Sequence, residues 1–220
     1  RQLVFPSDLI IACLWQNEDG DAYLLRKISR NRFCFDHRTE RWFKFRGHFW
    51  AEDTRAEIFD QIAPVVDLYA KESQRQLAAA NKARQVENEK QAEHHMKLVS
   101  ELGKRITRLQ AKHRKESVIE LSRNGAESLG ISGTEWDSDP WILPCENGVI
   151  DLKRGVIRPG KPLDYIKTYA PTVYQGMDHR SAVWEEFMEQ VFNGDAEMVD
   201  FMQTLLGGSL IGLAIEHFLA

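Results

Sequence analysis

E-W-D-S-D-P-W-I-L-P-C-E-N-G-V-I-D-L-K-R-G-V-I-R-P-G, residues 135–160, is the stretch of this sequence that says most about its fold. Residues that favour turns surround two short apolar runs at 141–143 and 149–152, which have the composition of β-strands. Gly155 lies in a short loop after the second run, where glycine readily takes positive φ, and we expect the chain to return along 156–158. The stretch therefore predicts a small antiparallel sheet made of hairpins.

The composition is that of an ordinary globular protein, with 220 residues of which 43% are hydrophobic and 28% are charged. The three cysteines are far apart and show no C-x-x-C spacing, which argues against a disulfide framework or a zinc ribbon and favours a reducing, cytoplasmic setting. No apolar run approaches the roughly 20 residues that span a bilayer, and no secretory signal is visible. We therefore expect no membrane partner. Both ends of the sequence suggest a piece of a longer protein.

The sequence as a whole predicts an α+β protein, with small antiparallel sheets or β-ribbons and a mostly helical remainder that includes long charged helices. It divides into three sections. Residues 1–60 predict an N-terminal helix and an aromatic β-ribbon with strands at 33–35 and 42–45. Residues 61–130 predict a long helical section, because they are rich in strong helix formers. Residues 131–220 predict the hairpin sheet followed by two helices.

Several local features refine this outline. Asn17-Glu18-Asp19-Gly20 predicts a turn, and Gly103 inside the helical pattern is a possible bend. Residues 165–169 could add an edge strand to the hairpin sheet. Asp195 is a plausible N-terminal cap for the last helix, because acidic residues follow it in the first turn.

Charge is unevenly distributed along the chain. The formal net charge is −4, but residues 71–116 contain 12 Lys and Arg against 6 Asp and Glu. Residues 177–220 contain 1 basic residue against 8 acidic residues. The small net negative charge is therefore the sum of a basic helical section and an acidic C-terminal section.

The opening stretch also contains the pattern aromatic-D-x-D-P-x-x-L-x-x-x-N-G-x-x-D-L-x-x-G-x-x-x-P. The matching residues are Trp136, Asp137, Asp139, Pro140, Leu143, Asn147, Gly148, Asp151, Leu152, Gly155 and Pro159. A Trp-led acidic helix at 184–187 and the run L-G-G-S-L-I-G at 206–212 follow. Through these residues the chain resembles the domain just before the ATPase motor of phage and plasmid primase–helicases and poxvirus-type replication NTPases, the superfamily-three helicases. The resemblance is strongest over 136–212, moderate over 33–60 and vague across the long helices.

This resemblance implies a pre-helicase domain whose parent protein uses ATP and Mg²⁺ in a motor and assembles into a ring. A phosphate-binding loop needs G-x-x-x-x-G-K-[ST], and neither Gly103-Lys104 nor Gly160-Lys161 fits that pattern. In the family, the strand that leads to this loop begins just after the L-G-G-S-L-I-G helix, so we expect residues 218–220 to start it. The ATP site would then lie beyond the chain, and we expect no cofactor within it.

Candidate catalytic and metal-binding residues are few. Asp137 and Asp139 could hold a divalent ion, as paired carboxylates do in primase centres, but D-S-D-P before a strand is also typical turn chemistry, which we favour. His94, His95 and His113 lie in charged helical sequence with no matching second pair of ligands, so a solvated helix face accounts for them. No serine lies in a G-x-S-x-G pattern. We therefore predict no catalytic and no metal site.

Two groups of residues are candidates for nucleic-acid binding. The aromatic ribbon interleaves cations with tryptophans that could stack on unpaired bases, and the alternative is that the tryptophans belong to the core. Its candidate residues are Arg41, Trp42, Lys44, Arg46 and Trp50. The second group is a basic helical stretch made of Lys97, Lys104, Arg105, Arg108, Lys112, Arg114 and Lys115. Lys97, Lys104, Arg108 and Lys115 recur near helical multiples and could form a stripe that faces phosphates, with a plain solvated face as the alternative.

The sequence leads to one main functional hypothesis, a domain that places single-stranded or forked DNA, and neighbouring subunits, against an ATP-driven ring helicase in DNA replication. Two alternatives stay open. The first is a helical protein–protein adaptor or oligomerisation module with no DNA role. The second is a primase centre built on Asp137 and Asp139.

Overall fold

A computed structural model describes residues 4–212, and the chain forms two compact units. Unit 1 consists of Arg1–Lys44 and Glu52–Gly133, and unit 2 consists of Phe45–Ala51 and Thr134–Ala220. About 53% of the structure is helical and the sheets are small, which confirms the predicted α+β class. The units cut across the three predicted sections, because the N-terminal helices and the long helices share one core.

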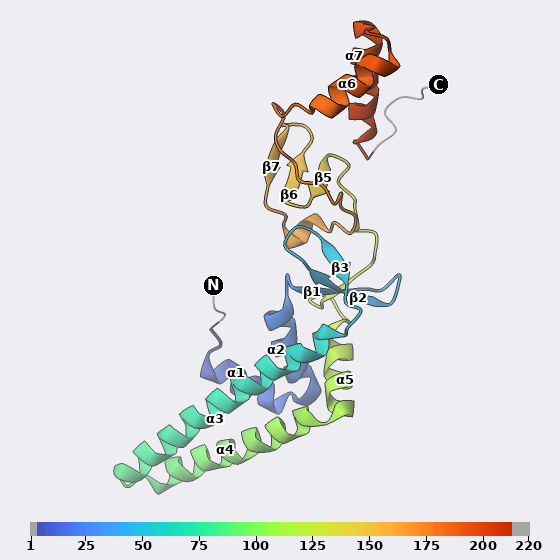
Figure 1. Cartoon of the computed structure of the whole chain (residues 1–220). Coiled ribbons are helices and arrows are strands. Elements are labelled where there is room, and N and C mark those ends of the chain that lie inside the picture. Colours follow the sequence, from blue (N-terminus) through green and yellow to red (C-terminus); the bar gives the residue numbers. More distant parts are fainter. Residues whose placement is uncertain (1–3, 213–220) are drawn as a thin grey trace. The chain divides into compact units, whose positions relative to one another are not determined.

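Helices make up most of the described part of unit 1 (Figure 1). They are α1 Ser7–Trp15, α2 Asn17–Ser29, the short 3-10 helix η1 Glu57–Gln61, α3 Ile62–Gln85, α4 Glu89–Gln110 and α5 Lys112–Ser122. The helices α3 and α4 run side by side as a long hairpin (Figure 1). The possible bend at Gly103 does not occur, since α4 continues through this residue without interruption.

The predicted turn at residues 17–20 is wrong, because α2 begins at Asn17. Gln16 alone separates α1 from α2, and Asn17, the first residue of α2, has a positive φ of 53°. Gly20 then lies directly against α1, where an added Cβ would stand 1.9 Å from the carbonyl oxygen of Cys13. A glycine that suggests a turn in the sequence is instead the point at which two helices touch.

Unit 1 also contains most of a four-stranded sheet with the order β3-β2-β1-β4. Its strands are β1 Phe33–Asp36, β2 Arg41–Phe45, β3 Trp50–Glu52 and β4 Gly130–Ile131. The strands β1 and β2 pair antiparallel, with Cys34 opposite Phe43, as the aromatic ribbon predicts. The strand β4 pairs parallel to β1, with Phe35 opposite Gly130. The sequence did not indicate this pairing, because the two strands are far apart along the chain.

The mainly apolar core of unit 1 contains a buried ionic cluster around Asp21. Its largest buried side chains include Ile10, Leu25, Phe33, Ile62, Tyr69, Leu102 and Leu109. Asp21 of α2 is fully buried and accepts hydrogen bonds from Tyr69 Oη at 2.7 Å, Arg105 Nη1 at 2.9 Å and Arg114 Nη2 at 2.6 Å. Burial raises the pKa of Asp21, and the hydrogen bond from Tyr69 and the charge of Arg105 oppose that shift. One carboxylate thus joins α2, α3, α4 and α5.

Unit 2 contains a three-stranded antiparallel sheet and two helices near the C-terminus (Figure 1). The elements are β5 Ile142–Cys145, β6 Gly148–Asp151, β7 Val156–Arg158, the short 3-10 helix η2 Pro162–Asp164, α6 Ala182–Val191 and α7 Ala196–Ser209. This confirms the hairpin sheet and the two helices. Residues 165–169 do not form an edge strand; only an isolated bridge between Cys145 and Ala170 is present there.

The turns of the opening stretch explain its sequence pattern. Asp137 has a positive φ of 48°, and its Oδ1 accepts hydrogen bonds from Lys167 N at 2.9 Å and from Thr168 Oγ1 at 3.2 Å. Asp139 Oδ1 accepts a hydrogen bond from Trp141 N at 3.0 Å. Asp139 therefore shows the local turn chemistry that the sequence favoured over a metal site, whereas Asp137 fastens its turn to a segment 30 residues further along the chain.

Candidate nucleic-acid interface

Three of the predicted cations form an exposed group on α4. Lys97, Lys104 and Arg108 are exposed, and their spacing of seven and four residues places them on one helix face. Lys104 Nζ donates to Glu101 Oε1 at 2.8 Å. The pKa of Glu101 lies below its usual value, first because of this hydrogen bond and then through the charges of Lys104, Arg108 and Lys97. All three cations therefore act on one point of the α4 surface, which we call the α4 cationic face.

The predicted stripe does not continue onto the next helix. Ala111 has an extended backbone, with φ −73° and ψ 136°, and it separates α4 from α5. The helix α5 leaves the line of α4 at this residue (Figure 1). Lys112 Nζ lies 3.5 Å from Glu116 Oε1, and Lys115 is only half-exposed. The α4 cationic face therefore ends at Arg108, and the extension to Lys115 is wrong.

Arg105 and Arg114 are corrections to the predicted set. Their exposed fractions are 4% and 7%, because both point into the core toward Asp21. Arg105 also donates to the carbonyl oxygens of Leu14 and Asn17, each at 2.8 Å. Buried guanidinium groups held by a carboxylate and by backbone oxygens are not available to phosphates. A basic helical run cannot show which of its arginines points inward.

Trp50 of the aromatic ribbon is a core residue, as the alternative reading of the sequence held, and Trp42 packs half-buried against the core. Trp50 is 3% exposed, and its Nε1 donates to the carbonyl oxygen of Pro162 at 2.9 Å within unit 2. Trp42 is half-buried against the core of unit 1, edge-on to Phe35 with ring centroids 5.3 Å apart. The Trp50 ring therefore does not offer the open face that base stacking needs.

The ribbon cations are placed differently from its tryptophans. Arg41 is exposed, with Nη1 2.5 Å from Glu52 Oε1. Lys44 is half-buried, pairs with Glu57 and lies over the Phe33 ring. Arg46 is exposed at the start of the turn that precedes β3. No structural observation tests DNA binding by these three residues, which stay predictions.

An aromatic residue absent from the sequence prediction lies beside the α4 cationic face. Trp15, the last residue of α1, is 55% exposed. It lines a hollow of about 100 Å³ together with Lys104 and Arg108. No local sequence pattern indicates this proximity, because only the packing of α1 against α4 brings Trp15 close to α4.

Comparison with known proteins decides the family. The family model described as D5 N terminal like matches residues 22–193, which is well over half of the chain. The chain belongs to the D5 N-terminal-like family. This domain is the N-terminal region found in phage and poxvirus D5-type primase–helicase proteins, and the match does not include a helicase motor. A search of curated proteins found no match.

In this D5 N-terminal-like chain, neither Gly103-Lys104 nor Gly160-Lys161 forms a phosphate-binding loop. Gly103 lies inside α4, and Gly160 packs on the backbone of His48, so neither glycine opens a loop of backbone N–H groups in front of its lysine. Residues 218–220, expected to start the strand toward such a loop, lie outside the described residues. Within residues 4–212, no three His, Cys, Asp or Glu side chains gather as metal ligands. None of the described helices is long and apolar enough to cross a membrane.

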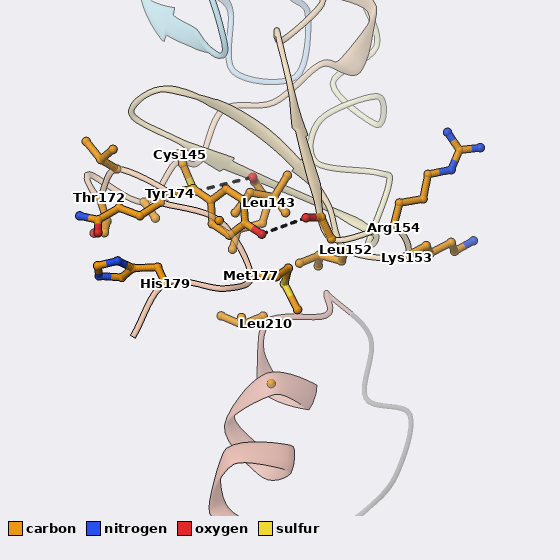
Figure 2. A pocket seen from close by; sticks show the side chains of 17 residues that line it. Leu143, Cys145, Leu152, Lys153, Arg154, Thr172, Tyr174, Met177, His179 and Leu210 are labelled. Atoms are coloured by element: carbon orange, nitrogen blue, oxygen red, sulfur yellow. Dashed lines mark hydrogen bonds between the residues drawn. The ribbon is translucent and has the colours of Figure 1, made fainter. Parts of the chain in front are cut away.

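The D5 N-terminal-like chain also has a larger hollow in unit 2, with a volume of about 910 Å³ (Figure 2). Its wall is mainly apolar, and Met177, Leu210 and Tyr174 lie around it (Figure 2). The Tyr174 hydroxyl donates to the carbonyl oxygen of Gly155 at 2.9 Å. Lys153 and Arg154 extend away from the hollow (Figure 2). The hollow therefore offers mainly apolar surface, and the Tyr174 hydroxyl in its wall already donates its hydrogen bond within the chain.

Proposed function

We propose that this D5 N-terminal-like domain binds DNA through the α4 cationic face and so places DNA for a helicase motor during replication. The observation that carries the proposal is the exposed trio Lys97, Lys104 and Arg108 on one side of α4. The opposite side of α4, with Leu102 and Leu109, is buried in the core. This packing holds the helix, and therefore the backbone that carries the cations, in place. Placing DNA requires no reactive side chain.

The charge distribution supports binding to phosphates. The formal net charge of −4 would repel DNA, but residues 71–116 carry 12 basic residues against 6 acidic residues. Each phosphate that a cation neutralises releases condensed counterions, so the affinity should fall as salt rises. For three contacts, raising salt from 50 to 200 mM should weaken binding roughly 20- to 40-fold.

The wider setting of the domain is also part of the proposal. In a full D5-type primase–helicase, ATP and Mg²⁺ would act in the motor and not in this domain, and the other subunits of a ring would be its protein partners. A cytoplasmic location suits the three scattered cysteines. The support for these statements is the family match over residues 22–193, which covers the N-terminal region.

Charge reversal tests the proposal. We expect the triple variant Lys97→Glu, Lys104→Glu and Arg108→Glu to lose salt-dependent binding of single-stranded and forked oligonucleotides. Fluorescence anisotropy between 50 and 200 mM salt measures the affinity. The matched control reverses three exposed cations of unit 2, Lys153, Arg154 and Arg180, with the same change in net charge.

The control makes the outcome specific. If both triple variants weaken binding equally, net charge and not the α4 cationic face controls DNA binding, and the proposal fails. If the unmodified chain binds no DNA at 50 mM salt, the proposal also fails. Circular dichroism confirms that each variant keeps its helices.

A second candidate function is a protein–protein adaptor. It is favoured by apolar side chains left exposed on α6, where Val183, Phe187 and Val191 recur every four residues and Val183 is 80% exposed. Exposed apolar surface of this kind often marks a contact with another protein. A folded chain that binds no DNA at low salt, but associates with increasing concentration in light scattering, would favour the adaptor.

A further inference from the structure

We infer that Trp15 is a base-stacking residue, and that the α4 cationic face therefore takes single-stranded DNA in preference to duplex DNA. The inference rests on the proposed function and names its substrate class. Trp15 also precedes residues 22–193, so the family match assigns nothing to it.

Trp15 is unusual because of where α1 places it. The helix buries Ile10, Cys13 and Leu14 in the core of unit 1. Trp15 is the next residue along the chain, yet it is 55% exposed. The side chains that α1 contributes to the core therefore do not include the Trp15 indole, which is in contact with water. An exposed indole offers a large flat apolar face together with one polar N–H group, which suits it for contact with a ligand.

The neighbours of Trp15 match the two halves of a nucleotide. Trp15, Lys104 and Arg108 line the same hollow, so a flat aromatic surface and two cations lie within one small site. Proteins that bind single strands combine these two elements, because bases stack on aromatic rings while cations hold the phosphates. The volume of about 100 Å³ is far below the roughly 300 Å³ of small ligand pockets. A base would therefore not enter the hollow but would lie on the exposed Trp15 ring at its edge, which forms the platform.

Arg105 is a positioning residue for this platform. Its Nη2 donates to the carbonyl oxygen of Leu14 at 2.8 Å and to Asn17 Oδ1 at 3.0 Å. These bonds hold the backbone before Trp15 and the side chain of Asn17 after it to α4. Arg105, which donates them, follows Lys104 directly in the sequence. The aromatic ring and the cations are therefore held together before DNA arrives, which lowers the entropy cost of binding.

The form of the DNA follows from the geometry of stacking. In a duplex the flat faces of the bases are already covered by their neighbours, so a duplex can use the cations but not the Trp15 ring. An unpaired base can use both. Stacking on one aromatic residue should strengthen single-strand binding about 5- to 150-fold.

The test uses the whole chain with two probes, an oligothymidine of about 12 residues (within the roughly 4–16 nucleotides that one single-strand-binding module covers) and a duplex of matched charge. We expect Trp15→Ala to weaken binding of the single strand at least 5-fold and to leave duplex binding unchanged. Trp15→Phe should restore most of the single-strand affinity, since an aromatic face returns. The control is Trp184→Ala, which removes a partly exposed tryptophan from the acidic helix α6.

A second readout reports stacking directly. An oligonucleotide with 2-aminopurine should lose fluorescence when it binds the unmodified chain, and should keep it when it binds Trp15→Ala at saturating protein. Equal loss of single-strand and duplex binding, or no loss at all, would overturn the role of Trp15. In the second case the charge-reversal variant still tests the proposed function separately. Failure of the unmodified chain to bind either probe would instead sink the proposed function.

Discussion

Asp21 joins four helices of unit 1 through its two carboxylate oxygens. Arg105 and Arg114 both reach it from α4 and α5, and none of the three side chains has appreciable contact with water. A buried charge of this kind is tolerated only when its partners are in place. The polar cluster therefore ties the packing of the helices to one specific arrangement.

We expect Asp21→Asn to lower the free energy of unfolding of unit 1 by about 3–5 kcal/mol, because two buried guanidinium groups lose their shared negative charge. Urea unfolding followed by circular dichroism at pH 7 measures the loss. The control is Asp19→Asn in the same helix, which is exposed and should change stability by less than about 0.5 kcal/mol. A similar small change in both variants would contradict the role of Asp21.

In unit 2, Arg158 and Asp164 form a two-point ion pair between β7 and η2. Arg158 Nη1 lies 2.7 Å from Asp164 Oδ2, and Nη2 lies 3.0 Å from Oδ1. Burial raises the pKa of Asp164, but the hydrogen bonds from Arg158 and from Lys161 N outweigh it, so the pKa lies below its usual value. The ionised carboxylate is therefore stabilised by folding.

This depressed pKa gives a prediction with a definite sign. The stabilisation by Asp164 is fully present above the unfolded pKa of about 3.9 and is lost as the pH falls through the lower folded value. Asp164→Asn should cost about 1–3 kcal/mol at pH 7, and its difference from the unmodified chain should shrink below about pH 4. Urea unfolding between pH 7 and pH 2.5 checks this. Asp178→Asn, an exposed change, is the control, and a constant difference for Asp164→Asn would contradict the prediction.

At the scale of elements, one side of α4 packs in the core and its other side presents cations to solvent. Leu98, Leu102 and Leu109 are buried along one side, and the cations lie on the exposed side. The helix itself was predicted, because this section of the sequence is rich in strong helix formers. The place of Arg105 was not, because it points inward to a partner 84 residues away.

For the start of α7, the local sequence was sufficient to predict the N-terminal cap. Asp195 Oδ1 accepts hydrogen bonds from Glu197 N at 3.0 Å and Met198 N at 3.2 Å, which confirms the predicted cap. Asp195→Ala should destabilise the first turn of α7 by about 1 kcal/mol and speed its amide hydrogen exchange. Asp200→Ala, an exposed change farther along the same helix, should leave that turn unaffected. Unchanged exchange in Asp195→Ala would show that the cap is not needed.

At the scale of the whole molecule, the chain passes through its units out of sequence order. Residues 45–51 belong to the same unit as the opening stretch of the sequence, and unit 1 resumes at Glu52. Trp50 therefore packs near Trp136 and Tyr165, in a core that is contiguous only in space. This is why the local pattern of the ribbon left both readings of its tryptophans open, and only the tertiary structure shows that Trp50 is buried.

The sequence by itself determined the α+β class, the strands and turns of residues 135–160, the long helices, the cap at Asp195 and the family. These depend on neighbouring residues, since turn formation, helix capping and periodicity act over a few positions. Only the tertiary structure decided which cations are buried, where the α4 cationic face ends, and that Trp15 lies beside Lys104. The physical reason is that burial and charge pairing join residues that are distant in sequence, and no local pattern records those partners.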